Sequence, residues 1–228
     1  MDVAPGTIVV FSDLGCPWAH AAVWRLWDAR RRLGLADDVS IDHRVFPLEL
    51  FNSEPTPRAT HDAEWPVIAA LAPRAGWGPW RGRADAWPTT MLPAMEAVQA
   101  AKTQSLEASA ALDRGLRRAF FGESRCISLR HVILEVANEC EIVDVAALAD
   151  ALDDGRARRA IFEQWEIAKS DEVSGSPHFF TPDGWNGQNP GVTMRWEGDD
   201  GQGGGFPVIE TNDPDAYEEL LRRATVPT

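Results

Sequence analysis

Hydrophobic residues near the start of the chain change spacing twice, and each change indicates a different element. Residues 7–13 contain a continuous apolar run at 8–11, which predicts a buried strand. Residues 21–33 place apolar side chains at helical spacing, and Gly34 then favours the end of a helix. Residues 39–45 alternate between apolar and polar positions, which predicts a second strand. This strand–helix–strand order predicts a βαβ unit.

The middle of the chain has the periodicity of helices, and short strands return near its end. Helices are predicted at 90–101, 105–121, 128–139, 145–153 and 155–172. Strands are predicted at 178–181, 192–196 and 206–210. A last helix is expected to run to about residue 224, with Asp213 as its cap and Pro214 as its first residue.

These elements predict an α/β fold that is interrupted by a helical block. We expect residues 1–55 and 172–228 to form the domain that contains the sheet, and residues 56–171 to form a helical insertion. A chain of 228 residues is long enough to bury a large core in such an arrangement.

Composition excludes several classes of function. The formal net charge is −13 and no basic stripe stands out, so a nucleic-acid partner is not expected. No apolar stretch is long enough for a membrane helix, and the first residues do not resemble a signal peptide. Three cysteines, an odd number, fit a reducing compartment better than a disulfide scaffold. We therefore expect a cytoplasmic protein without a membrane partner.

Cys16 is the strongest candidate for a reactive residue. It follows the first predicted strand and precedes Pro17 and Trp18, so it should lie at the N-terminus of a helix. The free N–H groups and the dipole at that end favour a thiolate, so we expect the thiol pKa to be lowered. Ala19 stands where a dithiol site would place its second cysteine. No spacing of His, Cys or Asp residues suggests a metal site.

Three other residues bear on this chemistry. His20 lies one helical turn after Cys16, where an imidazolium would lower the thiol pKa or a neutral ring would act as a base; a first-turn histidine without a role is the alternative. Cys126 and Cys140 have apolar neighbours and are expected to be packed thiols rather than resolving cysteines.

Two motifs in this order resemble a known family. Cys16-Pro17-Trp18 after a strand, and a helix followed by Gly175-Ser176-Pro177 and a strand, resemble the DsbA-like thioredoxin-fold proteins. The similarity is closest to the FrnE-like oxidoreductases, the 2-hydroxychromene-2-carboxylate isomerases and the kappa-class glutathione transferases. The resemblance implies a thioredoxin-like fold with a large α-helical insertion.

The resemblance also implies a set of site residues. Pro177 would be a cis-proline that faces Cys16. Substrate would contact the residues around these two, namely Pro17, Trp18, Ser176, Pro177 and His178. For His178, a purely structural role in the strand is the alternative.

Three functions remain open at this stage. The first is a monothiol thiol–disulfide oxidoreductase without a tightly bound cofactor, in which glutathione or mycothiol resolves a mixed disulfide on Cys16. The second is a glutathione-dependent transferase or isomerase acting on a small aromatic substrate, since those relatives usually have serine at the position of Cys16. The third is a peptide-binding module without catalysis. A homodimer is compatible with all three.

Two further segments invite a functional interpretation. Residues 65–87 hold four tryptophans among Arg74, Arg81 and Arg83. They predict either a groove for an anionic, aromatic or thiol ligand or a loop that packs its tryptophans on the helices. The glycine-rich run at 201–205 lacks the lysine and the helix of a phosphate loop, so a surface turn is expected.

Overall fold

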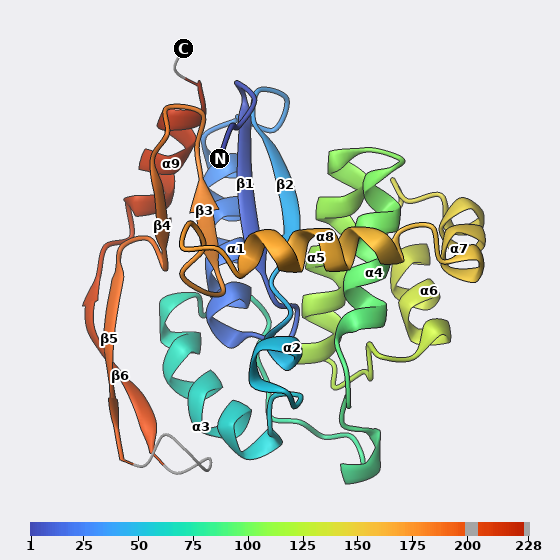
Figure 1. The fold of residues 1–228 in the computed structure, drawn as a ribbon. Coiled ribbons are helices and arrows are strands. Elements are labelled where there is room, and N and C mark those ends of the chain that lie inside the picture. The colour runs from blue at the N-terminus through green and yellow to red at the C-terminus, as the bar shows by residue number, and fades with distance from the viewer. Residues whose placement is uncertain (199–204, 226–228) are drawn as a thin grey trace.

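The computed structural model describes residues 1–198 and 205–225, and a mixed sheet lies between its helices (Figure 1). The sheet contains β1 (Thr7–Ser12), β2 (Ser40–Val45), β3 (His178–Phe180) and β4 (Asn186–Gln188), in the order β2-β1-β3-β4. Strands β1 and β2 are parallel, whereas β3 is antiparallel to β1 and to β4. The two parallel strands of the predicted βαβ unit are therefore confirmed, while β4 was not predicted.

Helix α1 (Pro17–Arg32) connects β1 to β2, and α9 (Ala216–Thr225) packs beside it. Their apolar faces and one face of the sheet bury a common core, which includes Ile8, Leu26 and Leu221. Burial of such side chains contributes about 1.5–3 kcal/mol each, so this core fixes the orientation of α1 on the sheet.

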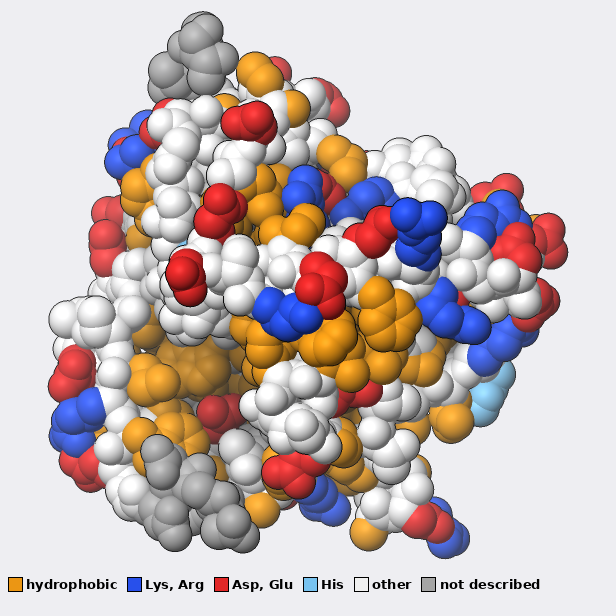
Figure 2. Space-filling model, in the orientation of Figure 1, with side chains coloured by type: hydrophobic (Ala, Val, Ile, Leu, Met, Phe, Trp, Pro, Cys, Tyr) orange, Lys and Arg blue, Asp and Glu red, His pale blue; other side chains and the backbone are white. Residues whose placement is uncertain are grey.

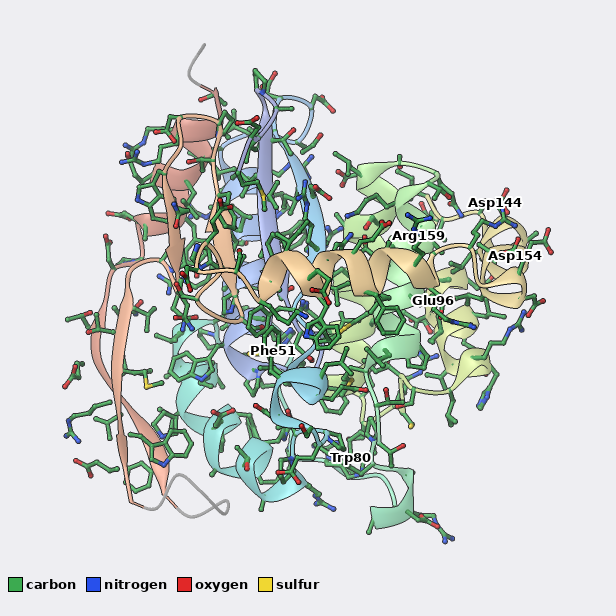
Figure 3. All side chains as sticks on the ribbon, viewed as in Figure 1. Phe51, Trp80, Glu96, Asp144, Asp154 and Arg159 are labelled. Carbon is green, nitrogen blue, oxygen red and sulfur yellow. The ribbon has the colours of Figure 1, made fainter. Side chains whose placement is uncertain are left out.

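The predicted helical block is confirmed, with small differences at the ends. It consists of α4 (Leu92–Lys102), α5 (Leu106–Phe121), α6 (Arg130–Asn138), α7 (Val145–Asp154) and α8 (Arg158–Ala168). Asp144 caps α7 by accepting a hydrogen bond from the backbone N–H of Ala147 at 3.0 Å. Helix α8 runs back from this block toward the sheet (Figure 1). Glu96 of α4 lies beside it (Figure 3), and Arg158 donates to that carboxylate at 3.1 Å.

The segment at residues 51–88 is more regular than its composition suggests. It contains the end of α2 (Leu48–Asn52), α3 (Arg58–Ile68) and two short 3₁₀ turns (Ala69–Leu71 and Ala84–Ala86). Pro57 occupies the N-cap of α3, where its missing N–H does no harm, and Pro66 lies inside the helix. The prolines of this segment are the reason that α3 was not predicted from the sequence. This helix packs against α1 and β6.

The remaining strands form a separate hairpin. Strands β5 (Val192–Glu197) and β6 (Phe206–Asn212) pair in antiparallel register and extend along one side of the molecule (Figure 1). The glycine-rich run at 201–205 connects them, and its residues 201–204 lie outside the described residues. Helix α9 begins at Ala216, two residues later than expected, and the Asp213 carboxylate accepts from the backbone N–H of Asp215 at 2.9 Å.

Within the described ranges, none of the helices is long and apolar enough to cross a membrane. The division into a sheet domain (1–55 and 172–228) and a helical insertion (56–171) stays a prediction, although α3 makes its contacts on the sheet side.

Candidate active site around Cys16

Cys16 is the N-cap residue of α1, and Pro17 is the first residue of that helix. Its side chain is turned inward, with an exposed fraction of 5%, and its Sγ donates to the backbone oxygen of Ser176 at 3.4 Å. The peptide bond from Ser176 to Pro177 is cis. The turn before α1 and the turn before β3 thus meet at the thiol, although 160 residues separate Cys16 from Ser176 in sequence.

Asp13 holds these two turns together. Its backbone N–H donates to Ser176 Oγ at 2.9 Å, and its carboxylate accepts from the backbone N–H groups of Gly15 and Leu48 at 2.7 and 2.9 Å. Burial raises the pKa of Asp13 to about 6, although both backbone donors act to lower it. No pattern in the sequence marks Asp13, because a lone acidic residue before a turn is not by itself a functional signal.

A buried arginine joins the same turn to the helical block. Arg117 of α5 donates to the backbone oxygen of Asp13 at 2.9 Å and to Ser12 Oγ at 2.8 Å. Its other N–H groups contact Asp113 one helical turn earlier, at 2.7 and 3.2 Å. The position of the turn before Cys16 therefore depends on a contact from the helical insertion.

The thiol pKa differs from the sequence expectation. Burial raises the pKa of Cys16 to about 12, the nearby Glu64 carboxyl adds to the increase, and the hydrogen bond to Ser176 opposes it. The helix N-terminus is present as expected, but removal of water from the thiol outweighs it. The expectation of a lowered pKa is therefore wrong for the buried Cys16 thiol.

An apolar cluster surrounds the thiol. Trp18, Ile68 and Ala72 pack in the same buried cluster as Cys16. Partly buried hydrophobic residues from three other elements cover it, namely Leu48, Val192 and Ile209. Figure 2 shows a hollow lined by hydrophobic side chains between the β5/β6 hairpin and the centre of the molecule. A substrate that reaches Cys16 from this side would meet an apolar wall.

His20 does not act on the thiol as an imidazolium. Its ring stacks on Phe121 with centroids 4.4 Å apart and meets Trp77 edge-on at the same distance. Burial lowers the pKa of His20 to about 3, and the Arg117 guanidinium contributes in the same direction. His20 is therefore neutral at pH 7. Its aromatic partners, Trp77 and Phe121, come from the loop before α4 and from the end of α5.

His178 is fixed within the fold by both ring nitrogens. Nδ1 accepts from the backbone N–H of Ser174 at 3.0 Å, so Nε2 carries the proton and donates to Asn186 Oδ1 at 3.1 Å. Burial lowers its pKa. The structural interpretation of this strand residue agrees with these contacts, and no ring nitrogen is left to polarise a substrate.

The other sequence candidates lie away from the thiol. Cys126 and Cys140 are half-buried free thiols, and Cys140 Sγ donates to the backbone oxygen of Ala111 at 3.6 Å. Trp80 and Trp87 pack edge-on against each other and contact Phe120 at the end of α5 (Trp80 is labelled in Figure 3). The packing interpretation of the tryptophan-rich segment therefore holds for these two residues.

Glu64 is the residue near the thiol that sequence reasoning missed. It lies on α3 one helical turn before Ile68, a member of the Cys16 cluster. Burial raises the pKa of Glu64 to about 7, and a hydrogen bond with the Trp18 side chain opposes this increase. No sequence signal marked this residue, because the helix that carries it was not predicted.

We expect Glu64→Gln to make Cys16 more reactive, because the substitution removes a carboxylate that disfavours the thiolate. In a Cys126→Ser, Cys140→Ser background, the rate of alkylation by iodoacetamide at pH 8 should rise by roughly threefold to tenfold. Asp62→Asn, at an exposed position of the same helix, is the matched control and should leave the rate unchanged. An unchanged rate in Glu64→Gln would show that its charge does not reach the thiol.

No group of three or more His, Cys, Asp or Glu side chains in the described part of the chain is arranged to hold a metal ion.

Comparison with solved structures places this geometry in a known fold. The cytosolic disulfide reductase DsbM from Pseudomonas aeruginosa superposes with a TM-score of 0.57 at 19% identity, covering 95% of this chain and 97% of that one. The same protein solved with GSH gives 0.57 at 18% identity, with the same coverage. A 2-hydroxychromene-2-carboxylate isomerase gives 0.56 at 18% identity, covering 79% of this chain and 88% of that one.

Sequence comparison gives the family directly. Among curated proteins, no sequence matches this chain. The profile described as the DSBA-like thioredoxin domain matches residues 7–200, which include both Cys16 and Pro177. Since the match spans most of the chain and the fold agrees, this protein belongs to the DSBA-like thioredoxin domain family.

Proposed function

We propose that this protein is a monothiol thiol–disulfide oxidoreductase of the FrnE-like type, which reduces disulfides through Cys16. The observation that supports this most directly is that the motif holds one cysteine, Cys16, and has alanine at position 19. Cys16 lies at the N-cap of α1 against the turn before Pro177, and the fully buried Ala19 occupies the position of a second cysteine. All three cysteines of the chain are free thiols.

The reaction requires two exchanges. The Cys16 thiol, after loss of its proton, attacks one sulfur of a substrate disulfide, so that a mixed disulfide forms and the other sulfur leaves as a thiol. The balance requires that the substrate is a mixed disulfide with a low-molecular-weight thiol, glutathione or mycothiol, and that Cys16 attacks the sulfur of this small thiol, so that the substrate leaves as a free thiol. A second molecule of the small thiol then attacks the mixed disulfide on Cys16. Cys16 leaves as a thiol, and the two small thiols remain joined as their own disulfide, having supplied the two electrons.

The raised pKa of Cys16 favours the reducing direction. Strongly oxidising thiol–disulfide oxidoreductases have a high reduction potential because the thiolate of their reduced form is stabilised. Burial of Cys16 disfavours that thiolate, so the reduced state gains no such stabilisation. A thiol that is protonated at neutral pH should also react faster as the pH rises.

The residues around the thiol are arranged to receive a sulfur substrate. The Ser176 backbone oxygen accepts from Cys16 Sγ, so a donor on the substrate can take this acceptor when the thiol reacts. Trp18 and Pro17 are buried beside it on the first turn of α1. We propose that the substrate lies against Pro17, Trp18, Ser176 and Pro177, with the apolar hollow beside them holding its uncharged part.

Oxidised glutathione is the direct test. We expect a single glutathione adduct on Cys16 by mass spectrometry, with a rate that increases by about tenfold for each pH unit between about pH 7 and 9. Added reduced glutathione should remove the adduct. The same adduct should form in the Cys126→Ser, Cys140→Ser variant, since neither thiol contacts Cys16. Absence of an adduct on Cys16, or an adduct that glutathione does not remove, would contradict the monothiol cycle.

A glutathione-dependent transferase or isomerase is the second candidate, and the hydrogen bond of the thiol favours it. A protonated Cys16 that donates to a backbone oxygen behaves as a serine hydroxyl would at this place. In such an enzyme Cys16 would orient the sulfur of bound glutathione without forming a bond to it. A cytoplasmic location and a homodimer stay predictions under both functions.

A further inference from the structure

A cleft of about 640 Å³ lies on the side of α1 that faces the helical block, and Cys16 does not line it. Its walls come from α1, from the loop after the first 3₁₀ turn, from α5 and from the loop between α6 and α7. The residues that line it include Val23, Trp24, Trp27, Arg74, Arg114 and Ile142. This volume falls within the range of about 300–1,000 Å³ that small-molecule sites occupy in proteins.

Arg114 brings to the cleft a positive charge that no salt bridge holds among the described residues, although the Glu107 and Asp113 carboxylates act on it at longer range. Its guanidinium donates to the backbone oxygen of Ala110 at 3.2 Å and lies 5.1 Å from the centre of the Trp27 ring. Among the described residues, no carboxylate lies within salt-bridge distance of it. Burial lowers its pKa, which shows that the charge is partly removed from water.

The other arginines of the cleft are already paired. Arg74 contacts Asp28 at 3.1 Å, Arg117 contacts Asp113, and Arg118 contacts Glu139 at 2.6 Å. Arg114 differs from them because its stacking on Trp27 leaves the edge of the guanidinium without an acid partner among the described residues. That edge is the part of an arginine which binds a carboxylate through two parallel hydrogen bonds.

The rest of the wall favours an apolar body on the ligand. Trp24 and Trp27 are half-buried, Val23 comes directly before Trp24 on α1, and Ile142 is exposed at the rim. His20 also lines the cleft, and its Nε2 has no hydrogen-bond partner in the described part of the chain. Glu141 is exposed at the same rim, so a second negative charge on the ligand would be disfavoured.

We propose that this cleft binds small aromatic monocarboxylates, with the carboxylate on Arg114 and the ring against Trp24 and Trp27. The site is separate from the thiol chemistry, and its occupation does not depend on the proposed function. No bond is made or broken in it, so binding alone tests the proposal.

Naphthoate is a suitable probe, and naphthalenemethanol is its uncharged counterpart. We expect naphthoate to shift the indole N–H NMR signals of Trp24 and Trp27, assigned with Trp→Phe variants, with a dissociation constant of about 0.1–1 mM. The uncharged alcohol and the Arg114→Met variant should both bind at least about tenfold more weakly. Arg130→Met, at an exposed arginine outside the cleft, should bind as the unchanged protein does.

A second variant guards against an indirect effect of Arg114→Met. Ala111→Phe fills the cleft from α5 without altering its charge, and it should abolish the shifts. The proposal is overturned by unchanged signals up to about 10 mM naphthoate. It is also overturned if shifts appear at Trp18 instead, or if the alcohol binds as tightly as the acid.

Discussion

Cys16→Ser is expected to abolish disulfide reduction, with a fall of at least about a thousandfold in the rate of mixed-disulfide turnover by glutathione. The hydroxyl of serine can replace the thiol as a donor to the Ser176 backbone oxygen, which the wild-type Sγ contacts at 3.4 Å. It cannot form a disulfide, so the covalent intermediate is lost while the fold is preserved. The assay is reduction of a glutathionylated peptide, with unfolding measured in parallel.

A comparison of Cys16→Ser with Cys16→Ala separates the two candidate functions. A thiol–disulfide oxidoreductase should lose its activity in both variants. A transferase or isomerase that needs only a hydrogen-bond donor should keep most of its activity in Cys16→Ser and lose it in Cys16→Ala. Conjugation of glutathione to chlorodinitrobenzene provides this second readout. Disulfide turnover that survives in Cys16→Ser would remove Cys16 from the mechanism.

Local patterns were sufficient to predict the βαβ unit and the place of Cys16 at the start of α1. The strand from Thr7 to Ser12 and the alternating strand from Ser40 to Val45 have periodicities that their burial repeats. Pro17 marks the start of α1 because proline is tolerated at the first position of a helix. The resemblance to DsbA-like proteins placed Ser176 and Pro177 near Cys16, which spacing along the chain alone does not give.

The environment of the thiol could not be predicted, because it depends on elements distant in sequence. The pKa of Cys16 was expected to fall from its place at a helix end, but burial and Glu64 of α3 raise it. His20 was placed correctly on the first turn of α1, yet Phe121 and Trp77 determine its state. In each case a local rule named the residue, and tertiary packing decided its charge.

The burial of Arg117, which bears on stability, could not be predicted from the sequence either. An arginine on a helix is ordinarily exposed to solvent. Here its exposed fraction is 1% and its N–H groups contact Asp113, Ser12 and the backbone of Asp13. Asp113 also lies 3.5 Å from His43 Nδ1 on β2. This buried network joins α5 to both parallel strands, so the turn before Cys16 rests on it.

We expect Arg117→Met to destabilise the protein by about 3–5 kcal/mol, because methionine leaves the buried Asp113 carboxylate without its cation. The midpoint of thermal unfolding should fall by roughly 10 °C for a chain of this size. Arg118→Met is the matched control, since the next arginine of α5 is half exposed and pairs with Glu123 and Glu139 at the surface; it should cost at most about 1 kcal/mol.

The pH dependence of this deficit identifies its cause. Burial acts to raise the pKa of Asp113, but Arg117 and His43 hold it below its usual value, so the wild-type network persists until acid protonates the carboxylate. In Arg117→Met, burial is no longer opposed by the guanidinium, and the folded state takes up a proton that the unfolded state does not. The deficit in unfolding free energy should therefore be larger at pH 7 than at pH 5. A deficit independent of pH, or one equal to that of Arg118→Met, would show that the ion pair does not hold α5 to β1.

If the network acts as described, Arg117→Met combined with Asp113→Leu should recover part of the loss, because it leaves no unpaired charge in the core.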